Sequence, residues 1–194
     1  LGAYLPRAVV LSNDFRREEL ARAYAASLGL PVAVKGKVET RDKSARALGF
    51  AYPGGRALSL AAQNGRADRY KLPQSRPDSG PYDWSFSGLK TAVVRLVERE
   101  GQELNVPDAA ASIESAIVGA LVERTMQAVD DRNARALTLA GGVAANQTLR
   151  DRLSAACSRE GVRFVAAPLA YCTDNAAMIG LAGSFRLARG ERET

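Results

Sequence analysis

The chain has 194 residues, of which 46% are apolar and 25% charged, with a formal net charge of +6. That length suits one large domain or two small ones, and the composition is sufficient to build a core. Histidine is absent, which excludes a Ser-His-Asp triad, a histidine zinc site and a histidine general base within this chain. No apolar window is long enough to span a membrane. Two cysteines without metal-ligand spacing suggest no disulfide framework, so we expect a cytoplasmic protein.

The positive charge lies mainly in the first part of the chain. Residues 1–80 carry 14 Lys and Arg against 7 Asp and Glu, a balance of +7, whereas residues 81–194 carry 13 against 14, a balance of −1. A basic half beside a neutral half fits an RNA or another phosphate-bearing partner. The alternative is a basic surface without a dedicated partner, because a net charge of this size is also normal for solubility.

The first part of the chain predicts α/β structure. Apolar runs and helical periodicity indicate a strand over residues 7–12, a helix over 15–28, a strand over 31–38, and short helices over 42–48 and 57–64. The segment that follows is rich in Pro, Ser, Asp and basic residues, which predicts a loop.

Three apolar stripes at helical spacing predict the main helices of the second part. Ser87 is expected to cap the first of these helices, and Asp108 is expected to start the longest helix of the chain. The stripes consist of Leu89, Ala92, Val93, Leu96 and Val97, then Ile113, Ile117, Leu121 and Val129, then Leu149, Leu153, Ala156 and Cys157.

The sequence predicts strands over residues 137–140 and 162–166, each followed by a helix, and the last helix spans 176–187. Strands that alternate with helices in this way are typical of a parallel sheet. The fold class we predict is therefore α/β. The expected division is a basic α/β segment over residues 1–65, a proline-rich loop over 66–84 and a C-terminal lobe over 85–194.

A glycine-rich turn follows the strand over residues 137–140. It reads Gly141-Gly142-Val143-Ala144-Ala145-Asn146 and opens a helix. Paired glycines let backbone N–H groups approach a phosphate closely, and a helix N-terminus adds a positive dipole end. Asn146 either caps the helix or hydrogen-bonds a ribose or an adenine. The turn is accordingly either part of a ligand site or a tight structural connection.

A second turn of the same plan comes after the next strand, where Thr173-Asp174-Asn175 opens the last helix. Asp174 can cap that helix. Its carboxylate can instead bind a hard divalent cation or iron through oxygen. Two such turns in one chain suggest a nucleotide or phosphate site.

Four motifs occur in an order and at a spacing that resemble one family. They are Tyr52-Pro53-Gly54-Gly55, residues 84–93 (WSFSGLKTAV), the glycine turn over 141–146, and residues 171–179 (YCTDNAAMI). Together they are similar to the C-terminal half of the TsaD family, the tRNA threonylcarbamoyladenosine synthases formerly called O-sialoglycoprotein endopeptidases (Gcp). The similarity extends over residues 39–189.

The resemblance implies an ASKHA fold, as in actin, Hsp70 and sugar kinases, mainly its C-terminal lobe, with the N-terminal lobe truncated or replaced. It implies a cytoplasmic acyltransferase that moves a threonylcarbamoyl group from threonylcarbamoyl-AMP to N6 of the tRNA adenosine next to the anticodon. The implied partners are tRNA and TsaB-like and TsaE-like subunits, with no membrane. The implied cofactors are a divalent metal, iron or zinc, and an adenylate or ATP ligand.

The same resemblance implies the site residues. Substrate or nucleotide contacts would come from Asp42, Gly55, Gly141, Gly142 and Asn146, and Asp174 would be the carboxylate ligand of the metal. No catalytic residue is assigned. The family's other metal ligands are a His-x-x-x-His pair, which a chain without histidine lacks, and residues 1–37 match nothing in the family pattern. The alternative to an active transferase is a non-catalytic module or fragment of the family that binds a nucleotide or a partner.

Overall fold

The computed structural model describes residues 8–11, 40–74, 82, 84–172 and 176–190. Its sheet has three parallel strands in the order β1 (Ala8–Leu11), β2 (Ala136–Leu139) and β3 (Arg163–Ala166). Leu137 of the central strand pairs with Val9 on one side and Phe164 on the other. The expected strands over 7–12, 137–140 and 162–166 are confirmed, and with them the α/β class. The helix and strand expected over 15–28 and 31–38 lie outside the described residues.

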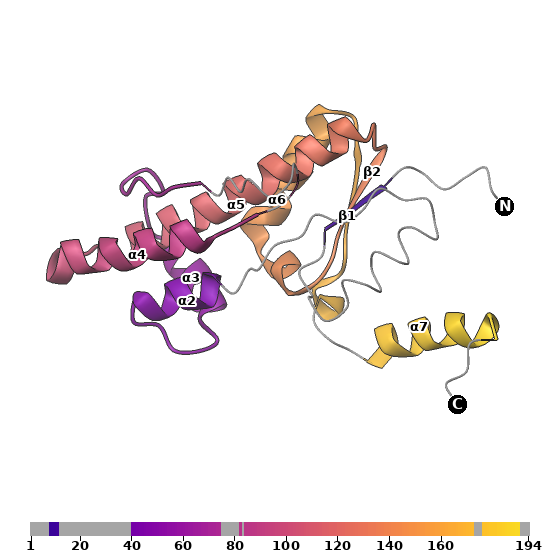
Figure 1. Ribbon diagram of the computed structural model, residues 1–194, viewed down its shortest axis with the longest axis horizontal. Helices are drawn as coiled ribbons and strands as arrows, with labels where there is room; N and C mark the ends of the chain where they lie inside the picture. The colour runs from indigo at the N-terminus through magenta and orange to yellow at the C-terminus, as the bar shows by residue number, and fades with distance from the viewer. Residues whose placement is uncertain (1–7, 12–39, 75–81, 83, 173–175, 191–194) are drawn as a thin grey trace.

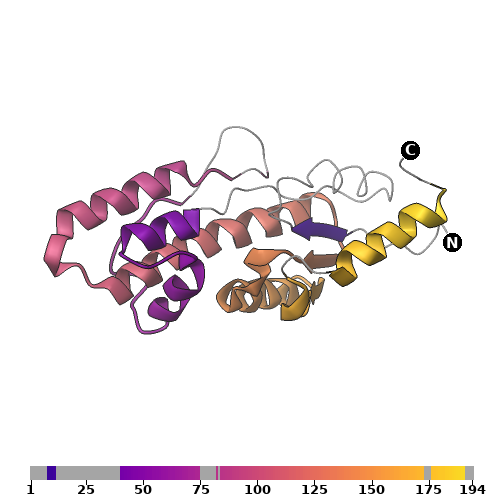
Figure 2. The same cartoon turned by 90° about the horizontal axis from the view of Figure 1, so that it is seen from below.

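Helices extend from this sheet to the far end of the molecule. Figure 1 shows α5 running from the sheet toward α2, α3 and α4, and Figure 2 shows the same arrangement from below. Short 3-10 turns precede α5, α6 and α7. The elements are α2 (Thr40–Ala47), α3 (Gly54–Ala62), α4 (Ser87–Glu100), η2 (Gly101–Glu103), α5 (Val106–Asp131), η3 (Gly142–Ala145), α6 (Gln147–Arg159), η4 (Leu169–Tyr171) and α7 (Ala176–Ala188).

The longest helix, α5, begins two residues earlier than expected. Its N-cap is Asn105, whose side chain accepts a hydrogen bond from the N–H of Asp108 at 3.0 Å. The carboxylate of Asp108 instead accepts from the backbone N–H of Arg66 at 2.7 Å and pairs with Arg69 at 3.5 Å. Asp108 therefore ties the segment after α3 to the start of α5, and its negative charge also suits the helix dipole.

The start of α4 corrects another prediction. Ser87 is the first helical residue rather than the cap, and Phe86 occupies the cap position without a side-chain hydrogen bond. Phe86 is only 4% exposed, and the indole N–H of Trp84 donates to the carbonyl of Ala120 on α5 at 3.1 Å. Packing of two buried aromatic side chains sets this helix start, because burying them contributes more than one capping hydrogen bond.

One core cluster joins the sheet to α2, α3, α4, α5 and α6. The three apolar stripes predicted from the sequence face inward. Their residues are less than 5% exposed, except Ala92 and Val97 of α4, which are half-buried. Burial on this scale supplies most of the free energy that holds helix to helix and helix to sheet. The same core positions the N-terminus of α6 and the ends of α2 and α3, which carry the predicted site residues.

The last helix, α7, confirms the helix expected over residues 176–187 but contributes little to this core. Four of its large apolar side chains are more than half exposed, namely Ile179, Leu181, Phe185 and Leu187. Among the helices that the structure describes, none is both long and apolar enough to cross a membrane.

Candidate nucleotide site

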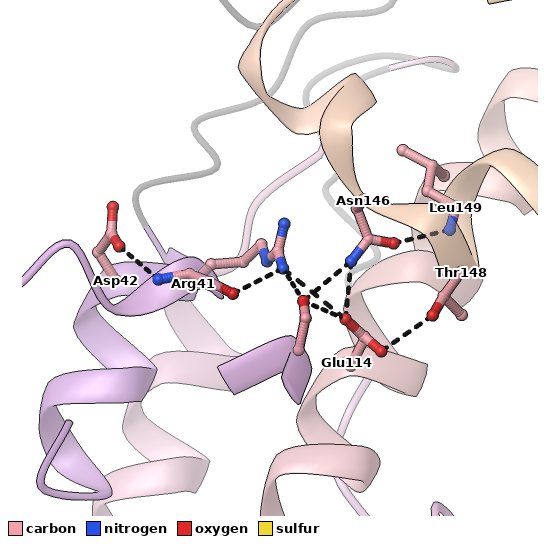
Figure 3. A network of polar contacts seen from close by, with 8 residues as sticks. Arg41, Asp42, Glu114, Asn146, Thr148 and Leu149 are labelled. Carbon is pink, nitrogen blue, oxygen red and sulfur yellow. Dashed lines mark hydrogen bonds and ion pairs between the residues drawn. The ribbon is translucent and has the colours of Figure 1, made fainter. Parts of the chain in front are cut away.

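The first part of the site is a hydrogen bond between α2 and α3. Helix α3 follows Pro53, which offers no side-chain cap, so the first N–H groups of the helix need another partner. The carboxylate of Asp42 on α2 accepts a hydrogen bond from the N–H of Gly55 at 2.9 Å. A carboxylate at a helix N-terminus also complements the helix dipole. Two residues implied to contact the ligand are thus in direct contact with each other (Figure 3).

Arg41, the neighbour of Asp42, points from α2 toward α5. Its guanidinium donates to the carbonyl of Gly55 at 3.0 Å and also to the hydroxyl of Ser59. It lies 3.7 Å from Glu114, and both side chains are largely buried, at 14% and 9% exposed. Burial lowers the pKa of Arg41, and the nearby negative charges of Glu114 and Asp42 oppose that shift. The ion pair offsets the cost of burying each charge alone.

Glu114 on α5 is the centre of the network in Figure 3. Its Oε1 accepts hydrogen bonds from the hydroxyl of Ser59 and the side-chain amide of Asn146, each at 2.7 Å. Its Oε2 accepts from the hydroxyl of Thr148 at 3.0 Å. One carboxylate therefore holds side chains from α3 and from the start of α6.

The glycine turn lies between β2 and α6, as predicted. Gly141 has φ of 88° and ψ of 173°, a conformation that side-chain-bearing residues rarely adopt. At Gly142 a Cβ would meet nothing within 4 Å, so the backbone there is open on that side. Asn146 caps α6 by accepting from the N–H of Leu149 at 2.7 Å. The cap interpretation of Asn146 is confirmed, and its contact with a ligand stays a prediction.

A small pocket adjoins this network. Its polar end is formed by Arg41, Glu114 and Asn146, and its other walls are apolar, from Ile117, Val118, Leu121, Val143 and Leu149. Its volume, about 10 Å³, leaves room for about one water molecule. The polar end of the pocket is the place where the α2–α3 contact and the start of α6 meet.

Comparison with known families identifies the chain. A family model described as TsaD, tRNA N6-adenosine threonylcarbamoyltransferase, matches residues 19–181. The chain belongs to the TsaD family. The match begins at residue 19, so the expectation that residues 1–37 lie outside the family pattern is wrong for residues 19–37.

Two curated relatives agree with this assignment. The tRNA N6-adenosine threonylcarbamoyltransferase of Parasynechococcus marenigrum (strain WH8102) is 50% identical over 184 residues, which covers 92% of this chain and 49% of that protein. That of Synechococcus sp. (strain WH7803) is 43% identical over 190 residues, covering 94% of this chain and 51% of that protein. The chain thus spans about half the length of the curated relatives it matches.

A solved structure shares the TsaD chain's fold at low sequence identity. HypF of T. kodakarensis superimposes with a TM-score of 0.58 and 18% identity, covering 86% of this chain and 22% of that one. A full-length HypF in a phosphate- and nucleotide-bound form gives a TM-score of 0.57 and 15% identity, covering 89% and 23%. This likeness concerns the fold alone, and it agrees with the α/β class.

The structure places most of the implied TsaD residues in one region. Asp42, Gly55 and Asn146 join one network through Arg41, Ser59 and Glu114. Sequence reasoning missed the three connecting residues. A signal for Glu114 exists, because it is the only charged residue between positions 109 and 122 on an otherwise apolar helix.

The metal implied for TsaD does not fit the residues that the structure describes. Asp174 lies outside them, and among them no group of three or more Cys, Asp and Glu residues is arranged to hold a metal ion. A divalent cation needs several oxygen, nitrogen or sulfur ligands around one point. We therefore derive no chemical step through a metal.

Proposed function

We propose that this chain supplies the adenylate-binding part of a tRNA N6-adenosine threonylcarbamoyltransferase with an ASKHA fold. In this reaction N6 of the adenosine next to the anticodon attacks the carbamoyl carbon of threonylcarbamoyl-AMP. A new N–C bond forms, the bond from that carbon to the phosphate oxygen breaks, AMP leaves with that oxygen, and one proton is lost from N6. The observation that carries the proposal is the single network that joins Asp42 and Gly55 to Asn146 in a chain of this family.

The proposed ligand contacts follow the chemistry of each part of the site. The polar groups of Asn146 and Glu114 suit a donor on the ligand, such as a ribose hydroxyl or the exocyclic amine of adenine. The turn at Gly141 and Gly142 suits the phosphate, because a glycine backbone allows close approach of a ligand and a helix N-terminus favours an anion. These contacts bind and orient the adenylate, and no catalytic residue is assigned.

The proposed partners are tRNA and TsaB-like and TsaE-like subunits in the cytoplasm. The net charge of +6, with a balance of +7 in residues 1–80, favours the phosphate backbone of tRNA. The division into segments 1–65, 66–84 and 85–194 remains a proposal. Asp174 stays the proposed carboxylate ligand of the family's metal, on the resemblance alone.

Transfer of the threonylcarbamoyl group to tRNA tests the proposed function. The protein is incubated with threonylcarbamoyl-AMP, unmodified tRNA and the two subunits, and modified adenosine is measured by mass spectrometry after digestion of the tRNA. We expect modification that depends on this chain. A reaction mixture without the chain is the control, and equal modification with and without it would contradict an enzymatic role.

The second candidate is a non-catalytic nucleotide- or partner-binding module of the same family. It takes the network around Asp42, Gly55 and Asn146 as a binding site alone, because no catalytic residue is assigned in it. This candidate predicts that the chain binds ATP or a TsaB-like subunit while no modified adenosine forms. Binding and transfer measured on the same preparation distinguish the two candidates.

A further inference from the structure

We infer that Glu114 is a positioning residue that orients the side-chain amide of Asn146 and joins α3 to the start of α6. The ligand-binding consequence of this inference rests on the proposed function, whereas the orientation of Asn146 does not. Glu114 is 7% exposed and carries no role in the family resemblance, yet every side-chain oxygen it has is used within the network.

The carboxylate of Glu114 has the partners that a buried charge requires. It accepts three hydrogen bonds from Ser59, Asn146 and Thr148, and the guanidinium of Arg41 lies 3.7 Å away. A buried carboxylate without such partners would be strongly unfavourable, so the network holds its donors in one arrangement. The two elements it joins, α3 and α6, start 93 residues apart in the sequence.

The amide of Asn146 has only one orientation that satisfies both of its ends. Its Nδ2 donates to Glu114 at 2.7 Å and to the hydroxyl of Ser59 at 3.2 Å, while its Oδ1 accepts from the N–H of Leu149. A flipped amide would set its oxygen against the carboxylate and its NH₂ against an N–H donor. Both Nδ2 hydrogens are used, so Asn146 can offer a ligand only the second lone pair of Oδ1. The facing group of the ligand must then be a donor, such as a hydroxyl or an exocyclic amine.

Substitutions at Glu114 separate hydrogen bonding from charge. Glu114→Gln keeps a carbonyl oxygen for Asn146 and Ser59, and its NH₂ can donate to the hydroxyl of Thr148. Glu114→Met has similar volume and no comparable acceptor. Glu114→Asp keeps the charge for Arg41, but its side chain is one methylene shorter and its carboxylate lies farther from Asn146. This variant replaces Glu114→Met in the test if Glu114→Met does not fold.

Two measurements are made on each variant. Solvent exchange of the Asn146 side-chain NH₂, followed by NMR, reports whether its hydrogens are held by Glu114 and Ser59. Calorimetric titration with ATP reports the proposed ligand site, at a temperature well below the melting temperature of each variant. The matched control is Asp108→Ala, which removes another buried carboxylate from the same helix, outside the network of Asn146.

We expect Glu114→Met and Glu114→Asp to lose protection of the Asn146 NH₂ and to weaken ATP binding by roughly tenfold or more, the scale of one lost hydrogen bond. Glu114→Gln should retain both properties, and Asp108→Ala should melt earlier with unchanged ATP affinity. Protection of the Asn146 NH₂ that survives in Glu114→Met or Glu114→Asp would overturn the inference. If the wild type binds no ATP, the proposed function fails, and the exchange measurement still decides the role of Glu114.

Discussion

Replacing Gly54 by alanine is expected to lower the free energy of unfolding by about 3 kcal/mol. A Cβ on Gly54 would lie 2.3 Å from the Cβ of Ala45, a residue of α2 that is fully buried. Neither atom can move without its helix, because a Cβ follows its backbone. Helix α3 must then withdraw from α2, and the bond from the N–H of Gly55 to Asp42 is lost. Thermal unfolding measures the first effect, and titration with ATP measures the loss at the site.

The control for Gly54→Ala is Gly88→Ala. Gly88 is an exposed residue of α4, and a Cβ there would meet nothing within 4 Å. Alanine favours a helix over glycine by up to about 1 kcal/mol, so this variant should melt at the wild-type temperature or above it. Equal melting temperatures for the two variants would mean that the close approach of α2 and α3 is unimportant.

Replacing Arg150 by methionine is expected to cost about 3 kcal/mol of stability, because hydrogen bonds from a charged group are among the stronger ones. The guanidinium donates to the carbonyls of Ala144 and Ala167, the latter at 2.6 Å, and to the sulfur of Cys172 at 3.1 Å. It thereby joins the glycine turn to the end of β3 and to the segment before Asp174. Without the guanidinium, the carbonyls of Ala144 and Ala167 lose a hydrogen-bond donor and the glycine turn is held less firmly. This change should also weaken ATP binding.

Arg150→Lys and Arg152→Met are the comparisons for this variant. Lysine keeps the charge but lacks the planar fork that reaches several acceptors at once, so its loss of stability should be intermediate. Arg152 is exposed on the same helix, and its substitution should leave the melting temperature near that of the wild type. Melting of Arg150→Met at the wild-type temperature would refute the bridging role.

Local patterns were sufficient to predict the buried faces of the helices. The stripe of Ile113, Ile117 and Leu121 is buried because a helix that packs on one side must place its apolar residues on that side. The cap at Asn146 was also predictable, since it depends on one side chain and an N–H three residues later.

The network around Glu114 could not be predicted in the same way. Its hydrogen-bond partners Ser59 and Asn146 lie 55 and 32 residues away in the sequence, and only the packing of α3, α5 and α6 brings them together. The prediction that Ser87 caps α4 was wrong for a similar reason, because the burial of Phe86 and Trp84 depends on α5. Sequence motifs predicted Asp42, Gly55 and Asn146, whereas the residues that connect them, Arg41, Ser59 and Glu114, are brought together only by tertiary packing.

Calorimetric titration of the chain with ATP, on the wild type and on Asn146→Ser, tests the central claim most directly. Serine keeps a side-chain acceptor for the helix cap and removes the amide that meets Glu114. The proposed adenylate site predicts binding to the wild type that is weakened at least about tenfold in Asn146→Ser. A folded wild type that binds no ATP, or equal affinity in both proteins, would contradict it.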